Sequence, residues 1–136
     1  MRASLALGLA AATAAIAVAA PAATVPGTSV RVAHWENESD PTPDARWTLR
    51  CNPPRGTLPR PGVACRRLLA GGPKLFAPVP PHTACTEIYG GPQRARVVGI
   101  VAGRRVWATF TRVNGCEIAR WDRLSPWLLP RGGVAG

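Results

Sequence analysis

The sequence predicts an α+β fold, in which an antiparallel β-sheet of about five strands carries two short helices and two disulfides. Several segments alternate apolar and polar residues, as strands with one buried face do. Near the carboxyl terminus, apolar residues recur at helical spacing behind a capping box. Four cysteines fall within a chain of 136 residues, which is long enough for one small domain.

Four segments show the alternation of strands, and two show helical signals. Val106, Ala108 and Phe110 share one face of a strand, which a tight turn at Ala102-Gly103 joins to the strand before it. The predicted strands are Ser29–Trp35, Arg46–Cys51, Arg94–Val101 and Arg104–Val113. The predicted helices are Cys65–Ala70, ended by Gly71-Gly72, and a segment that Asn114 caps with Glu117 and that Pro126 stops.

The remaining segments of the domain are predicted to be loops. Glu36–Asp44 is acidic and carries two prolines, and Asn52–Ala64 carries four prolines and two glycines. Neither composition suits regular structure. Leu75–Thr83 contains three prolines, so we expect it to be extended and exposed. It leads into the segment from Cys85 to Tyr89.

The amino terminus has the pattern of a cleaved signal peptide. Arg2 is the only charge before Arg31, and Leu5–Ala20 is apolar apart from one threonine. Small residues at positions 17, 19, 20 and 22 fit signal peptidase sites. A membrane anchor or a core helix is the alternative, but the apolar run is short for a span and small residues with Pro21 follow it directly. We therefore expect a signal peptide over 1–22, a flexible leader over 23–29, a domain over 30–129 and a disordered tail over 130–136, with export and no membrane contact after cleavage.

All four cysteines, Cys51, Cys65, Cys85 and Cys116, lie in the predicted domain. An exported chain meets oxidising conditions, so they are expected to form two disulfides. Spacing alone permits three pairings, of which the sequential one closes the shortest loops. A zinc site is the competing interpretation. It is weak, because no C-x2-C pair is present and neither histidine lies at ligand spacing to a cysteine. We expect neither a metal nor a cofactor.

The charge is high and carried almost entirely by arginine. Without Arg2, 16 basic side chains face 7 acidic ones, a formal net charge of +9. Such a field can attract nucleic acid, acidic polysaccharide or anionic envelope polymers. Nucleic acid is disfavoured, because the arginines are spread along the chain and few aromatic residues interleave with them. A solvated basic surface is the simplest interpretation.

Two cysteine segments together carry a resemblance to a known family. Residues 51–65 run Cys-Asn-Pro-Pro-Arg-Gly-Thr-Leu-Pro-Arg-Pro-Gly-Val-Ala-Cys, and residues 85–89 run Cys-Thr-Glu-Ile-Tyr. With Gly99, Gly103 and Asn114-x-Cys116, this ordered set resembles the Streptomyces subtilisin inhibitor family, over roughly Val30 to Trp121. The chain departs from the family pattern in three places. The segment Tyr89-Gly90-Gly91-Pro92 is one residue longer than the family's Tyr-Asp-Pro-Val. Val101 replaces the family's aromatic residue in the hairpin turn, and Leu58 replaces its histidine in the first loop.

The resemblance implies a reactive loop with a bait bond between Glu87 and Ile88, flanked by Thr86 and Tyr89. It implies that Asn114 braces this loop in addition to capping a helix. The implied disulfides are Cys51–Cys65 and Cys85–Cys116. The implied partner is a secreted serine endopeptidase, either subtilisin-like or glutamate-specific, and a homodimer through the sheet is implied as well.

The expected function is therefore that of a secreted protease inhibitor and not of an enzyme. Seven carboxylates and two histidines are available, and four of the carboxylates crowd into 36–44, so no nucleophile–base pairing is evident. The alternative is a non-inhibitory exported module that keeps the scaffold and binds an anionic partner through its arginines.

Overall fold

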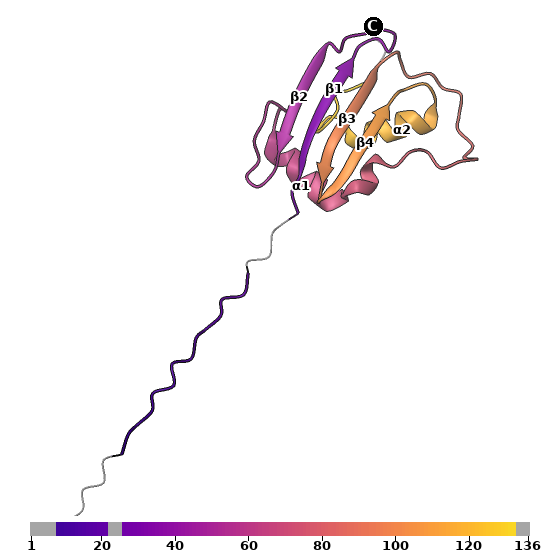
Figure 1. Cartoon of the computed structure of the whole chain (residues 1–136). Coiled ribbons are helices and arrows are strands. Elements are labelled where there is room, and N and C mark those ends of the chain that lie inside the picture. Colours follow the sequence, from indigo (N-terminus) through magenta and orange to yellow (C-terminus); the bar gives the residue numbers. More distant parts are fainter. Residues whose placement is uncertain (1–7, 22–25, 133–136) are drawn as a thin grey trace, which may run out of the picture.

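Four antiparallel strands form the sheet on which the domain is built (Figure 1). The computed structural model describes residues 8–21 and 26–132. The order across the sheet is β2-β1-β3-β4, and all three neighbouring pairs are antiparallel. The strands are β1 (Ser29–Trp35), β2 (Ala45–Arg50), β3 (Arg94–Val101) and β4 (Arg104–Phe110).

The α+β prediction is confirmed, with one strand fewer than expected among the described residues. Residues 83–93 are extended but join no ladder within the described part of the chain. Prolines at 80, 81 and 92 reduce the number of N–H donors in and around this segment, which disfavours a sheet strand.

Two helices and one 3-10 turn complete the domain: α1 (Pro61–Gly71), η1 (Pro73–Phe76) and α2 (Gly115–Leu124). The prediction for α1 was too short, because the helix begins at Pro61 within the segment assigned to a loop. Proline suits the first helical turn, where its missing N–H costs no hydrogen bond. Likewise, η1 occupies the start of a segment expected to be extended and exposed, and its Phe76 is buried.

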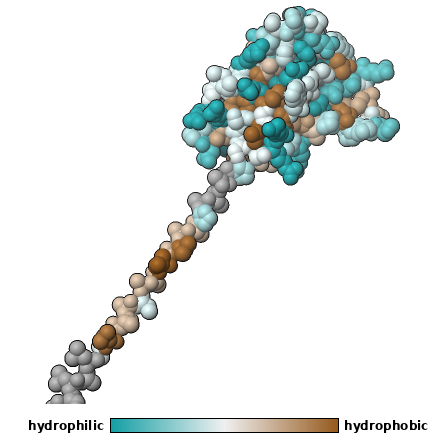
Figure 2. All heavy atoms as spheres, viewed as in Figure 1, coloured by the Kyte–Doolittle hydropathy of each residue, from teal (hydrophilic) through white to brown (hydrophobic). Residues whose placement is uncertain are grey.

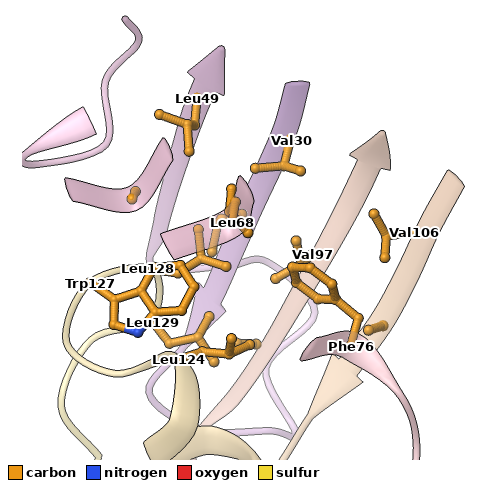
Figure 3. Close-up of a cluster of buried hydrophobic side chains, with 14 of the residues drawn as sticks. Val30, Leu49, Leu68, Phe76, Val97, Val106, Leu124, Trp127, Leu128 and Leu129 are labelled. Carbon is orange, nitrogen blue, oxygen red and sulfur yellow. The ribbon is translucent and has the colours of Figure 1, made fainter. Parts of the chain in front are cut away.

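Both helices cover the same face of the sheet, and the core lies between them and the strands (Figure 3). Val30 and Val97 from the sheet meet Leu68 of α1 and Leu124 of α2 in this cluster. The chain after α2 returns to the core, because Trp127, Leu128 and Leu129 are all buried. This last contribution follows the proline that ends α2, where the sequence pattern gave no periodic signal.

Both ends of the domain are attached to its body. At the amino end, Gly103 N donates to Gly27 O (3.0 Å), within the range expected to be a flexible leader. At the carboxyl end, Pro130 O accepts from Trp121 Nε1 (2.9 Å) and Ser125 Oγ (3.2 Å). Residues 133–136 of the expected tail lie outside the described residues.

The predicted signal peptide lies partly outside the described residues, at 1–7 and 22. Its described part, residues 8–21, has no regular structure and is exposed. In Figure 1 it runs away from the domain. Within the described part of the chain, no helix has the length and apolar character needed to cross a membrane.

The two disulfides join elements that are distant along the chain. Cys51, just after β2, is bonded to Cys65 of α1 with 5.6 Å between the Cα atoms. Cys85 is bonded to Cys116 in the first turn of α2 with 5.4 Å between the Cα atoms. The first disulfide fastens α1 to the sheet, and the second fastens the extended segment to α2.

The histidine of β1 is buried among aromatic rings. His34 of β1 is 3% exposed and lies between the rings of Trp47 and Trp121, with ring centroids 6.3 and 5.9 Å away. Burial lowers the pKa of this imidazole, and the carboxylates of Glu36 and Asp44 oppose the shift only in part. Its Nε2 has no hydrogen-bond partner among the described residues, so the neutral ring suits the site.

The lowered pKa of His34 predicts a loss of stability on acidification. Below its ordinary pKa of 6.5, the unfolded chain binds a proton that the folded chain refuses, so the free energy of unfolding falls as the pH falls. We expect urea unfolding of His34→Gln to depend less steeply on pH between about 7.5 and 5.5 than that of the parent protein. Parallel pH profiles for the two proteins would contradict this assignment.

Candidate functional site

The extended segment between η1 and β3 projects from the edge of the domain beside β4 and α2 (Figure 1). Its central side chains lie in solvent: Glu87 is exposed, and Ile88 and Tyr89 are 63% and 58% exposed. Side chains this exposed contribute little buried surface to the stability of the domain. Large exposed apolar side chains on a loop are typical of a contact surface for another protein.

On its upstream side, this segment is attached to the first turn of α2. The Cys85–Cys116 disulfide makes the covalent connection. One residue further on, Gly115 N donates to Thr86 O (2.9 Å). The approach is close, because a Cβ at Gly115 would overlap the hydroxyl of Thr86.

On its downstream side, the segment is attached to the residue that follows β4. Gly90 N donates to Arg112 O (2.7 Å), and Arg112 Nε donates to Gly90 O (3.2 Å). Here too the approach is close, since a Cβ at Gly90 would come within 2.8 Å of the Ile118 side chain. Two residues later, Glu38 N donates to Pro92 O (2.7 Å).

These two attachments leave Glu87, Ile88 and Tyr89 as a three-residue span. Among the described residues, none forms a hydrogen bond with the backbone N–H or C=O groups of this span. The span is therefore extended, exposed and unpaired, yet fixed at Thr86 and at Gly90. Such a span can pair its main chain with a partner and loses little conformational entropy when it does so.

Arg112 is a residue of this site that the sequence analysis missed. It is 8% exposed, and Nη1 donates to Asp122 Oδ1 (3.0 Å) on α2. Its guanidinium also lies over the ring of Trp121, 5.7 Å from the centroid. A signal was present: Arg112 continues the alternation of core-facing positions after Phe110, where a charged residue requires partners.

Asn114 serves as the amino-terminal cap of α2. Its Oδ1 accepts from Glu117 N (3.0 Å), as the capping box predicts. The direct contacts to the extended segment come instead from its neighbours, Arg112 and Gly115. The role of the Asn114 side chain in bracing the loop stays a prediction.

The residues expected to act together therefore lie together. Thr86 is the fixed end from which the span of Glu87, Ile88 and Tyr89 begins, and Asn114 lies at the terminus of the helix that holds this end. In the described part of the chain, no cluster of three or more His, Cys, Asp or Glu side chains could hold a metal ion. The arrangement presents the exposed main chain of Glu87, Ile88 and Tyr89 between two fixed points.

Comparisons with known proteins relate the chain to one family of inhibitor-like proteins. A model of the family described as subtilisin inhibitor-like matches residues 27–114. Subtilisin inhibitor-like protein 8 from Streptomyces virginiae is 35% identical over 92 residues, which cover 65% of this chain and 82% of that protein. Sermetstatin from Streptomyces caespitosus, solved in complex with Bacillus licheniformis subtilisin, is 26% identical with a TM-score of 0.53, and the match covers 77% of this chain and 99% of that one.

The contacts of Arg112 predict that its removal loosens the downstream attachment selectively. In Arg112→Met the bonds to Gly90 O and Asp122 are lost, so amide hydrogen exchange at Gly90 should accelerate by about tenfold or more. Exchange at Gly115, which depends on the upstream attachment, should change less. The matched control is Arg123→Met, which removes an exposed arginine of α2. Equal acceleration at both amides would show that Arg112 stabilises the whole domain and not this attachment.

Proposed function

Because the chain belongs to the subtilisin inhibitor-like family, we propose that it is a secreted inhibitor of serine endopeptidases with Glu87–Ile88 as its bait bond. The observation that carries this proposal is the unpaired span of Glu87, Ile88 and Tyr89 between its two attachments. The family and the likeness to an inhibitor solved with subtilisin support protease inhibition. They also favour a binding protein over an enzyme.

The span fits the requirements of substrate-like binding. A protease of this class binds its substrate extended, with main-chain hydrogen bonds along the cleft. The N–H and C=O groups of the span are free to make those bonds. The catalytic serine then faces the carbonyl carbon of Glu87, which it attacks while its histidine takes the hydroxyl proton.

The attachments explain why cleavage need not release the products. After the Glu87–Ile88 bond breaks, the new carboxyl end remains held through Thr86 and the Cys85–Cys116 disulfide. The new amino end remains held through Gly90 and Arg112. Because the amine stays near the acyl group, re-formation of the peptide bond competes with hydrolysis. Protease–inhibitor complexes of standard size are among the tightest known.

The side chain of Glu87 determines the partner within this proposal. A carboxylate placed in an apolar specificity pocket, without a partner, costs several kcal/mol. A pocket that carries histidine or arginine would pair with it instead. We therefore infer that the best partner is a glutamate-specific endopeptidase, and that trypsin is inhibited weakly.

Two finer points belong to the proposal and to the resemblance that suggested it. Secretion rests on the predicted signal peptide over residues 1–22. The homodimer stays a prediction, and sedimentation of the oxidised protein tests it.

The first test is a titration of the oxidised protein against subtilisin, trypsin and a glutamate-specific endopeptidase. We expect stoichiometric inhibition of the glutamate-specific enzyme. Glu87→Lys should tighten inhibition of trypsin by roughly a hundredfold or more, because a lysine pairs with the acidic pocket from which a carboxylate is repelled.

Glu38→Lys is the matched control, since it makes the same charge change in the 36–44 loop, and it should leave the preference unchanged. Stronger inhibition of trypsin than of the glutamate-specific enzyme by the parent protein would refute the proposed specificity. Rapid cleavage of the span without inhibition would refute the inhibitory mechanism itself.

A further inference from the structure

The face of the sheet opposite the core carries six arginines and no carboxylate. Strand residues alternate between the two faces, and the register identifies the side chains that share the open face. Figure 2 views the molecule from this side and shows hydrophilic residues around paler and hydrophobic ones. The open-face arginines are Arg31, Arg46, Arg50, Arg94, Arg96 and Arg105.

The register separates these arginines from one another. Directly across the strands, Arg31 faces Thr48 and Val98, and Ala33 faces Arg46 and Arg96. Neighbouring strands lie about 4.8 Å apart, and successive residues on one face about 6.7 Å apart. The positive charges are therefore spread over an area and not stacked in one column. A partner with charges repeated along its length can meet several of them at once.

The charges of this face are not neutralised within the domain. Among the described residues, no ion pair includes any of the six arginines. The guanidinium groups of Arg94 and Arg96 lie over the ring of Trp35, at 4.1 and 5.9 Å from its centroid. The Nε atoms of both have no hydrogen-bond partner in the described structure. The acidic segment 36–44 follows β1 and borders this face at the end where Trp35 pairs with Arg94. Pro41 and Pro43 line the larger groove of the face there, and Arg94 Nη2 donates to the main-chain Asp40 O (3.5 Å).

The surface between the arginines is grooved and partly apolar. Two grooves of about 440 and 510 Å³ run along the face, and Arg31, Thr48 and Val98 line both. Beside them, Trp107 is 75% exposed and Ile100 is 42% exposed. The guanidinium of Arg96 lies 5.9 Å from the centroid of the Trp107 ring. An extended ligand could thus combine ionic contacts with contact to one aromatic ring.

The homodimer through the sheet that the resemblance implies would place a second copy on this face, but the charges of this chain oppose that arrangement. Two copies related by a twofold axis would present the same patch to each other. Six arginines would then meet six arginines with no carboxylate on either side, and like charges across an interface oppose association. A long-chain nucleic acid also fits less well. Single-stranded binding uses a succession of exposed aromatic rings, whereas Trp35 is buried and leaves Trp107 as the exposed ring of this face.

We propose that the open face of the sheet binds an acidic polysaccharide. Carboxylate or sulfate groups along the polymer would pair with Arg31, Arg46 and Arg105, since guanidinium groups match such anions. A sugar ring would lie against Trp107. This surface is separate from the bait span, which leaves the domain at its edge beyond β4 and α2 (Figure 1). The two activities are therefore independent, and the protein binds polymer while its bait bond remains accessible.

The test measures binding of the oxidised protein to heparin as a function of salt. We expect the association constant to fall steeply with salt, as it does for polyanions that release counterions on binding. The triple variant Arg31→Gln, Arg46→Gln, Arg105→Gln should bind roughly tenfold more weakly or worse, with a salt slope shallower by about two to three. The control triple Arg66→Gln, Lys74→Gln, Arg123→Gln removes the same charge from exposed positions on α1, η1 and α2, and should bind nearly as the parent does.

Equal weakening by the two triples would overturn the proposal, because binding would then follow net charge and not this face. Tighter binding of a single-stranded oligonucleotide than of heparin would replace the polysaccharide with nucleic acid. A dimer in sedimentation that only the first triple disrupts would show that a second copy occupies the face.

Protease titration of both triples serves as an independent measurement. If the protein fails to bind heparin but inhibits its protease, the polysaccharide proposal is refuted and the proposed inhibitory function is unaffected. If it binds heparin through this face but inhibits no protease, the inhibitory function is refuted and the polysaccharide proposal is unaffected.

Discussion

The first turn of α2 and the residue that follows β4 hold the chain on both sides of Glu87–Tyr89, and the site depends on this double attachment. One attachment is covalent, through Cys85–Cys116. The other is a pair of hydrogen bonds between Gly90 and Arg112. Each alone would leave one end of the span free to move. Together they fix its ends, so that an exposed segment remains extended without a neighbour to pair with.

The double attachment is useful only because its supports are themselves fixed. Trp121 and Leu124 bury the inner face of α2 against the sheet. Trp127, Leu128 and Leu129 then pass under the same core (Figure 3), and Trp121 Nε1 donates to Pro130 O (2.9 Å). Arg112 joins this core to the loop, since it contacts Asp122 on one side and Gly90 on the other. Close packing of this kind resists small displacements, so the geometry of the span depends on core residues far from it in sequence.

Local patterns predicted most of the fold, and long-range contacts account for what they missed. The strands were predicted because alternation is a property of single segments, and α2 was predicted because Asn114 and Glu117 mark its start. The start of α1 was misplaced, since proline was treated as a loop residue although Pro61 suits the first turn of a helix. The exposed span was found through a resemblance. Its attachment to Arg112 could not be found in this way, because that contact joins residues 22 positions apart and no local pattern encodes it.

The period of two along a strand allows one sheet to support two separate surfaces. Residues such as Val30, Val32 and Val97 point into the core and determine the positions of the helices and hence of the bait span. The residues between them, such as Arg31 and Arg96, point away from the core. Substitution on the open face therefore changes charge without removing core volume, and it contributes little to the packing that holds α2. A high positive charge can thus accumulate on the open face while the geometry around Glu87 is maintained. The field of that face also acts at a distance of about one Debye length, roughly 8 Å in physiological salt, so its influence on a protease at the far edge of the domain is weak. Charge on the sheet and recognition at the loop are, on these grounds, properties that one fold can carry independently.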